Sequence, residues 1–551
     1  MATTMPANQQ GIDAAHRRVI FASSLGTVFE WYDFYLYGSL AAVISKQFFS
    51  GVNETTGFIF ALLAFAAGFA VRPFGALVFG RLGDLVGRKH TFLITIVIMG
   101  LSTALVGVLP SYAQAGVIAP VILIALRLLQ GLALGGEYGG AATYVAEYAP
   151  EGRRGFYTSW IQTTATLGLF LSLLVILFTR KMIGSEQFDA WGWRLPFLVS
   201  IVLLAISVYI RLQLRESPVF LEMKASGTRS KAPLTESFAR WGNLRIVILA
   251  LLGATAGQAV VWYGGQFYAL FFLTQVLKVD AQPANLLIAG ALLLGTPFFV
   301  LFGSLSDRIG RKKIVLLGCL LAAVTYIPIF HGITHYANPA IESASAQSPV
   351  TVVADPSACS FQFDPVGKKK FVKSCDIAKA ALAKAGVPYT NQSAPGGSTA
   401  VVRIGSGEVT SVDGASMPAA DFKAASAKFT KDLGEKLKAA GYPVKADPEQ
   451  INYPMVLLLL WILVLYVTMV YGPIAAWLVE LFPARIRYTS MSLPYHIGNG
   501  WFGGFLPPVA FALVALTGDI YYGLRYPIIV ALMTVVIGFL FLPETKDRRL
   551  Q

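Results

Sequence analysis

The sequence predicts an all-α membrane protein: twelve transmembrane helices in two six-helix bundles, with a small α+β domain inserted in the second bundle. Of the 551 residues, 55% are hydrophobic and 13% charged, whereas a soluble domain is about 25% charged. A ten-residue motif at 80–89 returns at 303–312, and a repeat at this distance indicates two related halves. A long polar stretch, 333–452, interrupts the second half.

We expect apolar segments of about 18 residues or more to cross the membrane. Twelve are present, at 20–45, 56–80, 91–110, 116–147, 155–180 and 194–212, then at 244–276, 284–305, 313–332, 453–480, 488–516 and 524–542. The domains expected from them are a tail (1–19), the N-terminal bundle (20–212), a linker (213–243), the C-terminal bundle (244–332 and 453–543), the insert (333–452) and a second tail (544–551).

The basic residues lie mainly in the gaps after even-numbered segments. By the positive-inside rule these gaps, both termini and the linker are cytoplasmic. The net charge of +14 is explained by this placement, so we expect no nucleic-acid partner. Residues 1–16 are polar and do not resemble a signal peptide. We expect a multi-pass protein of the bacterial inner membrane.

The repeated motif predicts a cytoplasmic gate. Gly80 and Gly303 would let a helix end and turn, and Asp84 and Asp307 can accept hydrogen bonds from the start of a neighbouring helix. We expect both aspartates to latch the gate while the protein faces outward. The remaining gating candidates in the motif are Gly87, Arg88, Lys89, Arg308, Arg311 and Lys312.

Two junctions further along the chain share an acid followed by paired arginines. The first is Glu147 with Arg153 and Arg154, and the second is Glu480 with Arg485 and Arg487. Both lie at cytoplasmic helix ends. The first resembles the gate motif at the same place in sugar porters and the second mirrors it, and this resemblance implies that each acid forms an ion pair of the gate.

The first segment carries Glu30, Asp33 and Tyr37 on one helical face. Ionisable groups inside the bilayer are costly, and two close carboxylates repel when both are ionised. One of them is thus a candidate for reversible protonation. The alternatives are that Glu30 pairs statically with an arginine or lies in water near the cytoplasmic end.

Segment four places Arg127, Gln130 and Glu137 on one face. Arg72, in segment two, stays ionised at any working pH, so it needs either a static partner (Glu30 or Asp33) or a substrate carboxylate. We predict that Asp33 and Glu30 hold the proton, and that Arg127 and Glu137 modulate its release.

Polar and aromatic residues inside the segments are candidates for substrate binding. For the aromatic residues of segment seven the alternative is an interfacial belt, and a lone buried histidine is more often structural. The substrate candidates are Arg72, Tyr37, Gln130, Gln162, Gln258, Trp262, Tyr263, Tyr495, His496 and Asn499.

The insert follows an odd-numbered segment and should therefore be extracytoplasmic, in the periplasm. We expect amphipathic helices at 419–440 and 375–385 and strand-like alternation at 401–412. Its two cysteines, Cys359 and Cys375, either form a disulfide, which would contribute about 3 kcal/mol, or are buried separately as thiols. No cluster of metal ligands is present, so we expect no metal site.

The repeated loop resembles the signature of the major facilitator superfamily. Glu-Trp-Tyr-Asp-Phe-Tyr at 30–35, Arg-Pro-Phe-Gly at 72–75, Gly-Gly-Glu-Tyr-Gly-Gly at 135–140 and Ser-Leu-Pro-Tyr-His-Ile-Gly-Asn at 492–499 together resemble its metabolite:H⁺ symporter family. That family includes porters of α-ketoglutarate, citrate, shikimate and proline/betaine. The resemblance implies alternating access between two bundles, and it does not extend to the insert.

The function expected is proton-coupled symport, with uptake of a small organic acid or zwitterion. The expected partners are this small-molecule substrate, which carries a carboxylate, together with protons and the lipid bilayer; we expect a monomer that needs no cofactor beyond the proton gradient. The alternatives are a membrane metabolite sensor that uses the insert, or an uncoupled facilitator. An enzyme is disfavoured, since no nucleophile–base set is present.

Overall fold

The structure is a computed structural model that describes residues 14–50, 68, 70–362 and 371–550. The side chains of 14–23, 30, 34, 38, 41 and 42 also lie outside the described residues, and with them the predicted role of Glu30. Within the described part, ten helical segments are long and apolar enough to cross a membrane. They correspond to the third to twelfth predicted segments.

The N-terminal bundle packs α5 between α7 and α11, and α1 against α9. The predicted C-terminal end of the first segment was wrong, because α1 stops at Ser39 and a separate short helix follows. The second lies largely outside the described residues. The helices are α1 (Ala14–Ser39), α2 (Ala41–Phe48), α4 (Arg72–Leu85), α5 (Arg88–Val108), α6 (Tyr112–Ala115), α7 (Ile118–Tyr148), α8 (Arg154–Gln162), α9 (Thr164–Ile183), α10 (Ser185–Gln187), η1 (Phe188–Gly192) and α11 (Arg194–Leu212).

The linker contributes two short helices, α12 (Pro218–Ala225) and α13 (Pro233–Phe238). Two spans of the C-terminal bundle contain π-helical turns, which are frequent at functional sites. The helices are α14 (Trp241–Ala250), η2 (Leu251–Thr255), α15 (Ala256–Tyr263), η3 (Gly264–Tyr268), α16 (Ala269–Phe271), η4 (Phe272–Val276), α17 (Ala281–Ile309), α18 (Arg311–Ala337), α22 (Tyr453–Tyr471), α23 (Ile474–Leu481), η6 (Ala484–Ile486), α24 (Arg487–Ile497), η7 (Gly498–Gly503), α25 (Leu506–Thr517), η8 (Tyr522–Leu524) and α26 (Arg525–Phe541).

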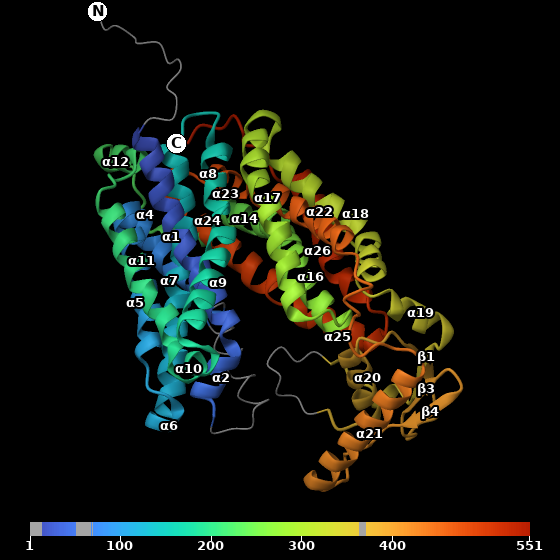
Figure 1. The fold of residues 1–551 in the computed structure, drawn as a ribbon. Helices are drawn as coiled ribbons and strands as arrows, with labels where there is room; N and C mark the ends of the chain where they lie inside the picture. The colour runs from blue at the N-terminus through green and yellow to red at the C-terminus, as the bar shows by residue number, and fades with distance from the viewer. Residues whose placement is uncertain (1–13, 51–67, 69, 363–370, 551) are drawn as a thin grey trace, which may run out of the picture.

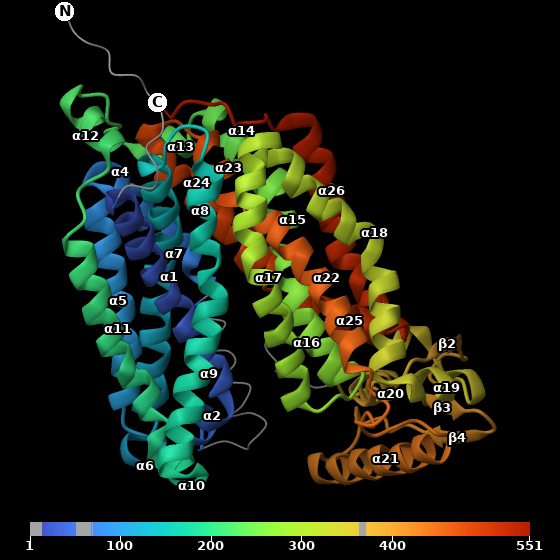
Figure 2. The same cartoon turned by 45° about the horizontal axis from the view of Figure 1, so that its top comes forward.

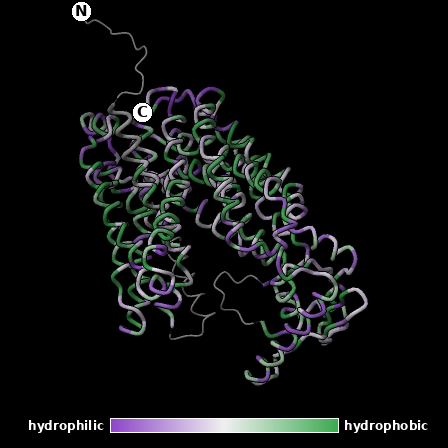
Figure 3. The backbone as a smooth tube through the Cα atoms, viewed as in Figure 1, coloured by the Kyte–Doolittle hydropathy of each residue, from purple (hydrophilic) through white to green (hydrophobic). Residues whose placement is uncertain are grey.

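The two bundles converge at the end where α1 begins and α26 ends, and their ribbons diverge toward the opposite end (Figures 1 and 2). Between the halves, α4 packs on α24 and α8 packs on α17. Hydrophobic residues cover the helices of both bundles, whereas the insert is largely hydrophilic (Figure 3). The fold therefore places the converging end, and the interface beyond it, at the centre of any transport path.

The insert folds around a hydrophobic core of its own. Its four-stranded sheet has the order β2-β1-β3-β4. Strands β1 and β2 are parallel and are connected through α20, whereas the pairs β1–β3 and β3–β4 are antiparallel. The predicted helices are present, and the predicted strand region is a hairpin. The elements are α19 (Pro339–Gln347), β1 (Val350–Ala354), η5 (Pro356–Ala358), α20 (Ser374–Ala385), β2 (Thr390–Ser393), β3 (Val401–Ile404), β4 (Gly407–Thr410) and α21 (Ala419–Ala439).

A disulfide joins Cys359 to Cys375, with 5.2 Å between the Cα atoms. It ties the chain before the α20 helix to the first turn of that helix. The third cysteine, Cys319, is buried in α18.

The insert docks on the end of α25. Carbonyl groups in the last turn of a helix have no partner within the helix, and here the insert supplies donors. Lys379 Nζ donates to the Leu516 carbonyl at 3.1 Å, Asn391 Nδ2 to that of Thr517 at 2.8 Å, and the backbone N–H of Tyr389 to that of Gly518 at 3.0 Å. A lysine at a helix C-terminus is also electrostatically favourable. The described contacts therefore attach the insert to the C-terminal bundle.

Candidate functional site: a cytoplasmic gate and a buried polar cluster

The loop motif of the first half closes onto α24 of the second half. Asp84 Oδ2 accepts hydrogen bonds from the backbone N–H (2.9 Å) and the hydroxyl (2.7 Å) of Thr489. Arg88 is fully buried, with Nη1 3.1 Å from Asp84 Oδ1 and Nε 3.6 Å from Glu147 Oε2. Glu147 Oε1 in turn pairs with Arg487 Nη1 at 3.0 Å. This chain of charges crosses from one half into the other.

The loop motif of the second half makes the equivalent contacts on α8 of the first half. The two oxygens of Asp307 accept hydrogen bonds from the backbone N–H groups of residues 155–156, each at 2.8 Å. Arg311 is buried between Asp307 (Nη1 to Oδ1, 2.6 Å) and Glu480 (Nη2 to Oε1, 3.1 Å). Arg154 Nη1 reaches Glu480 Oε1 at 3.5 Å. Both aspartates thus accept from the start of a helix in the other half, as the motif predicted.

The prediction for two motif glycines was wrong. Gly80 lies inside α4 and Gly303 inside α17, so neither ends a helix. The turns occur at Gly87 (φ 137°) and Gly310 (φ 119°), in the backbone region that favours glycine. Gly80 instead permits close approach of the two halves, because a Cβ there would lie 2.8 Å from Thr489 Cα.

The lysines of the motif bind helix ends within their own half. Lys89 Nζ donates to the Leu212 carbonyl at 3.0 Å, and Lys312 Nζ to the Leu542 carbonyl at 2.8 Å. Both carbonyls lie at the C-terminal end of the last long helix of a bundle, α11 or α26, so these lysines hold each bundle together.

Three of the predicted gating arginines lie outside the two buried networks. Arg153 and Arg308 are exposed. Arg485 pairs with Glu236 of the linker at 2.6 Å. Each junction acid does form an ion pair, but with the second arginine of the other junction: Glu147 with Arg487 at 3.0 Å, and Glu480 with Arg154 at 3.5 Å. The second arginine of each pair points inward, because its position in the helix turn faces the other half and the position of the first arginine does not.

A second site is a cluster of buried polar groups within the N-terminal bundle. Arg127 Nη1 lies 3.0 Å from Asp33 Oδ2 and 2.6 Å from Gln130 Oε1. Gln130 Nε2 donates to Asp33 Oδ1 (3.1 Å) and Thr103 Oγ1 (2.6 Å). The guanidinium lies 4.1 Å from the centre of the Tyr37 ring, within cation–π range. Helices α1, α5 and α7 thus bring one carboxylate, one guanidinium and three neutral partners together.

The structure separates Glu137 from this cluster. Its carboxylate forms a buried ion pair with Arg211 Nη2 and accepts from Thr95 Oγ1 at 2.7 Å. Arg211 also donates to the Phe92 carbonyl and lies over the Phe92 ring. Arg127 and Glu137 lie on one face of α7, as predicted. However, Arg127 contacts Asp33, whereas Glu137 contacts Arg211.

Aromatic residues from both halves meet at the interface. The Tyr138 and Tyr495 rings stack at 3.7 Å between centroids, and the Tyr495 hydroxyl lies 2.8 Å from that of Tyr471. Trp31 of the first half lies 5.2 Å from Trp262 of the second. Aromatic faces of this kind can hold an apolar ring or a cationic group of a substrate.

Amide groups accompany these rings. Gln162 Nε2 donates to the Tyr138 hydroxyl at 2.8 Å. Gln258 and Asn499 exchange two hydrogen bonds of 3.2 Å each between α15 and η7. Tyr263, also a substrate candidate, packs edge-on against Trp262 at 5.0 Å.

His496 is buried, and its Nε2 has no hydrogen-bond partner among the described atoms. The same holds for Trp262 Nε1. Arg72 is the partly buried first residue of α4. The pairing of Arg72 with Asp33, one of the predicted alternatives, is not seen, because Asp33 pairs with Arg127.

Several residues of these sites were not identified from the sequence. Arg211 could have been recognised from the sequence, since it is a charged residue inside the predicted segment 194–212. No sequence pattern indicates the two acids that accept hydrogen bonds from the first N–H groups of α5 and α18, because only the fold brings them there. They are Glu216 (3.1 Å to Arg88 N) and Glu544 (2.9 Å to Arg311 N). The hydroxyl partners of the gate acids were also missed: Ser217 on Glu147 and Thr545 on Glu480.

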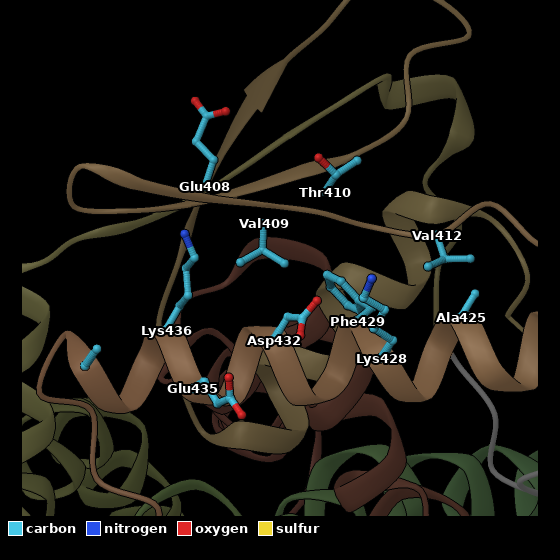
Figure 4. Close-up of a pocket in the computed structure, with 11 residues that line it drawn as sticks. Glu408, Val409, Thr410, Val412, Ala425, Lys428, Phe429, Asp432, Glu435 and Lys436 are labelled. Carbon is cyan, nitrogen blue, oxygen red and sulfur yellow. The ribbon is translucent and has the colours of Figure 1, made fainter.

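The insert has a groove of its own, about 620 Å³ in volume, between β4 and α21 (Figure 4). Val409 and Phe429 form its floor, and Asp432, Lys428 and Lys436 lie along its helical side. Acidic and basic side chains alternate there. The groove belongs to the insert and is remote from the Asp33 cluster in the chain and in the fold.

Comparison with known proteins matches residues 19–240 and 439–551 to the family "Sugar (and other) transporter". The chain belongs to this family of the major facilitator superfamily. A second family, "MFS/sugar transport protein", matches 140–347. Residues 348–438, within the insert, are matched by neither.

Curated relatives are identical to this chain at about a third of the aligned positions, and the alignments cover about two thirds to three quarters of their length. It is 36% identical to the proline/betaine transporter of Salmonella typhimurium over 58% of this chain and 65% of that protein. It is 36% identical to the shikimate transporter of Escherichia coli (57% and 72% covered) and 34% identical to the E. coli alpha-ketoglutarate permease (61% and 77% covered).

Among solved structures, the proton:xylose symporter XylE is similar, with a TM-score of 0.61, 15% identity and 98% of both chains covered. This likeness establishes the fold. The family and the ten membrane-span candidates together make the chain a multi-pass inner-membrane transporter.

Proposed function

We propose that this transporter is a proton-coupled symporter that imports a small carboxylate-bearing metabolite by alternating access. The observation that carries the proposal is the buried pair of Asp33 and Arg127, completed by Gln130. Among the described residues Asp33 forms one ion pair, with Arg127, and a buried acid paired in this way can exchange its partner for a proton.

The proposed coupling follows from this pair. When Asp33 is ionised, it neutralises Arg127. When Asp33 takes up a proton, its carboxylate no longer offsets the charge of Arg127, and a substrate carboxylate can take its place. Proton and anion therefore favour each other's binding, and neither charge stays alone in the bilayer.

The substrate class is supported by the relatives, since proline, betaine, shikimate and alpha-ketoglutarate all carry a carboxylate. The aromatic rings and the Gln258–Asn499 pair would contact the rest of the molecule. Arg127 and Glu137, both on α7, would modulate proton release, with Glu137 held by Arg211 of α11. No cofactor is needed, because the gradient supplies the free energy.

We further propose twelve membrane crossings in a monomer, with both termini cytoplasmic and the insert periplasmic. α1 is 26 residues long and packs within the N-terminal bundle, which supports a first crossing. The start of α1 and the end of α26 lie at one end of the molecule and the insert lies at the other (Figure 1). With this orientation the closed gate is cytoplasmic and the protein faces outward.

Uptake into proteoliposomes under an imposed inside-alkaline pH gradient tests the proposal. We expect an organic acid or betaine from a labelled panel to accumulate above its external concentration, and a protonophore to abolish this. Equilibration without accumulation would instead indicate a facilitator. No uptake of any compound would favour a sensor.

An added membrane potential separates the substrate classes. A monoanion with one proton moves no net charge, whereas a zwitterion with one proton moves one positive charge, worth about 2.3 kcal/mol per 100 mV. Stimulation by an inside-negative potential thus indicates a zwitterion or more than one proton.

A further inference from the structure

The sheet of the insert has two outer strands, and the rest of the fold contacts only one of them closely. At the edge of β2, the N–H of Tyr389 and the side chain of Asn391 donate to carbonyls at the end of α25. β4 forms the other edge of the sheet and is separated from α21 by the groove described above (Figure 4). Because an outer strand with unpaired backbone groups is a template for another strand, β4 is the edge that can accept one.

The backbone groups of Glu408 and Thr410 form this open edge. Only two residues lie between β3 and β4, and in such a hairpin the residues beside the turn exchange hydrogen bonds, whereas the next pair does not. The N–H of Ser411 donates to the Ala400 carbonyl at 2.8 Å, as this register requires. Within the described residues no hydrogen bond reaches the N–H groups of Glu408 and Thr410, which point away from β3.

The other side of the groove is α21, which runs antiparallel to β4. A Cβ added to Gly407, at the start of β4, would lie 3.7 Å from Lys436 Nζ, and one added to Gly414, beyond the strand, would lie 2.3 Å from the ring of Phe422. A helix rises about 1.5 Å per residue and a strand about 3.3 Å, so about two helical residues keep pace with one strand residue. Helix and strand therefore stay side by side along the groove.

Lys428, Asp432 and Lys436 form a row of alternating charge on α21, and all three point toward β4 (Figure 4). Their spacing of four residues places them about 6 Å apart along the helix, close to the roughly 6.8 Å between alternate side chains of a strand. In the part of the chain that the structure describes, none of the three forms an ion pair, whereas Glu435 pairs with Lys431 outside the row. The row therefore offers three charges to an occupant of the groove.

We propose that the insert binds an extended peptide segment of a partner protein, which pairs with the free edge of β4 as a fifth strand. Side chains alternate between the two faces of a strand, so every second residue of the peptide would face α21. Complementarity to the row requires an acid, a base and an acid at three such positions, facing Lys436, Asp432 and Lys428. The aliphatic part of a central arginine would lie on the apolar floor of Val409 and Phe429. Backbone pairing supplies affinity, and the charge row supplies selectivity.

Fluorescence anisotropy with the full-length protein in detergent tests the charge pattern. The probe is the labelled peptide Thr-Glu-Thr-Arg-Thr-Glu-Thr, in which threonine favours an extended strand. The control peptide Thr-Lys-Thr-Glu-Thr-Lys-Thr has the inverted pattern. We expect the probe to bind at least tenfold more tightly than the control, because three attractions become three repulsions.

A charge-reversed protein should exchange these preferences. In the triple variant Lys428→Glu, Asp432→Lys and Lys436→Glu, we expect the inverted peptide to bind more tightly than the original probe. Lys438→Glu is the matched control, because this exposed lysine of α21 does not line the groove. It should leave the affinity for both peptides unchanged.

Thr410→Pro tests the backbone pairing. Proline removes an N–H that faces outward, which an edge strand tolerates, and we expect the probe to bind about tenfold more weakly. Thr410→Val keeps the N–H and should bind the probe like the wild type. In the wild-type protein, bound probe should also slow hydrogen exchange of the amides of Glu408 and Thr410 and leave β2 unchanged.

Four outcomes would overturn the proposal. They are absence of probe binding, equal affinity for the two peptides, unchanged exchange at β4 with the probe bound, and a dimer of the full-length protein that Thr410→Pro disrupts. The last would show that β4 pairs with a second copy of the chain. Melting temperatures identify misfolded variants, and if Thr410→Pro misfolds, hydrogen exchange of the wild-type protein decides.

Discussion

The two bundles are alike at the end where they converge, the proposed gate, and unlike inside the membrane. At the gate, each half contributes a motif aspartate, a buried arginine and a junction acid, and receives an arginine from the other half. Within the bilayer, the buried ion pairs Asp33–Arg127 and Glu137–Arg211 both belong to the N-terminal bundle. The described middle of the C-terminal bundle offers His496, amides and aromatic rings instead.

This difference indicates a division of labour. Gate contacts must form and break symmetrically if the halves rock about a central axis, so duplication conserves them in both halves. Proton coupling needs only one titrating site, so a single bundle suffices. The other bundle is then free to contact the substrate and to carry the insert.

The largest expected effect comes from Asp33→Asn. The neutral amide cannot exchange a proton, so gradient-driven accumulation should be abolished while substrate exchange across the membrane continues. In contrast, His496→Asn in the C-terminal bundle should raise the KM several-fold and leave accumulation intact. Labelled uptake and counterflow in proteoliposomes measure both.

Asp189→Asn is the matched control for Asp33→Asn, because Asp189 is an exposed aspartate of the same bundle that pairs with Arg180 near the surface. It should transport normally. Accumulation retained in Asp33→Asn, or lost in His496→Asn alone, would reverse the proposed division of labour.

The symmetry of the gate predicts equal effects of Glu147→Gln and Glu480→Gln. Each change leaves two buried arginines without their shared carboxylate, and removal of one partner from a buried pair costs about 3–5 kcal/mol. Both variants should shift toward the inward-facing state. Labelling of a single cysteine at the extracellular side of the interface should fall in both, and a fall in only one would show that one network dominates.

A smaller shift in the same direction is expected for Asp84→Asn and Asp307→Asn. These changes weaken the charged hydrogen bonds to the starts of α24 and α8, worth about 1–3 kcal/mol. The same labelling assay measures the shift. If labelling from outside is unchanged, the motif serves only as a topological anchor.

The smallest effect concerns the insert, which only the C-terminal bundle carries. Hydrogen bonds from the backbone N–H of Gly397 and from Ser357 hold the pKa of Asp355 below its usual value. A lowered folded-state pKa stabilises the fold above the ordinary aspartate pKa of about 3.9, and this stabilisation is lost as the pH falls through the lowered value. Hydrogen-exchange protection of the insert in the full chain should therefore decline on acidification.

Asp355→Asn should reduce that protection at neutral pH and remove this part of its pH dependence. Asp421→Asn, on the exposed first turn of α21, is the control. Identical pH profiles for wild type and Asp355→Asn would rule out this contribution.

Much of the fold could be predicted from local sequence patterns. Hydrophobic runs depend only on neighbouring residues, so ten of the predicted crossings match described helices. The gate acids and arginines could be found because the duplicated motif marks them twice. The helices of the insert followed from their amphipathic spacing.

Partner identity could not be predicted in the same way. The periodicity of α7 places Arg127 and Glu137 on one face, but the registers of α1 and α11 decide that one faces Asp33 and the other Arg211. Gly80 was assigned to a helix end because local rules favour glycine there, whereas the actual constraint is the approach of α24. Such contacts depend on how distant helices pack.

The ends of the insert remain side by side. The backbone N–H of Asn452, just before α22, donates to the carbonyl of Tyr336, at the end of α18, at 2.8 Å. The chain thus leaves the bundle and re-enters it more than a hundred residues later, at two points joined by one hydrogen bond, as in a hairpin. A graft of this kind imposes no strain on its host. The helical core and the insert are therefore separable units, and another module whose ends lie equally close together could replace the insert without rebuilding the bundle.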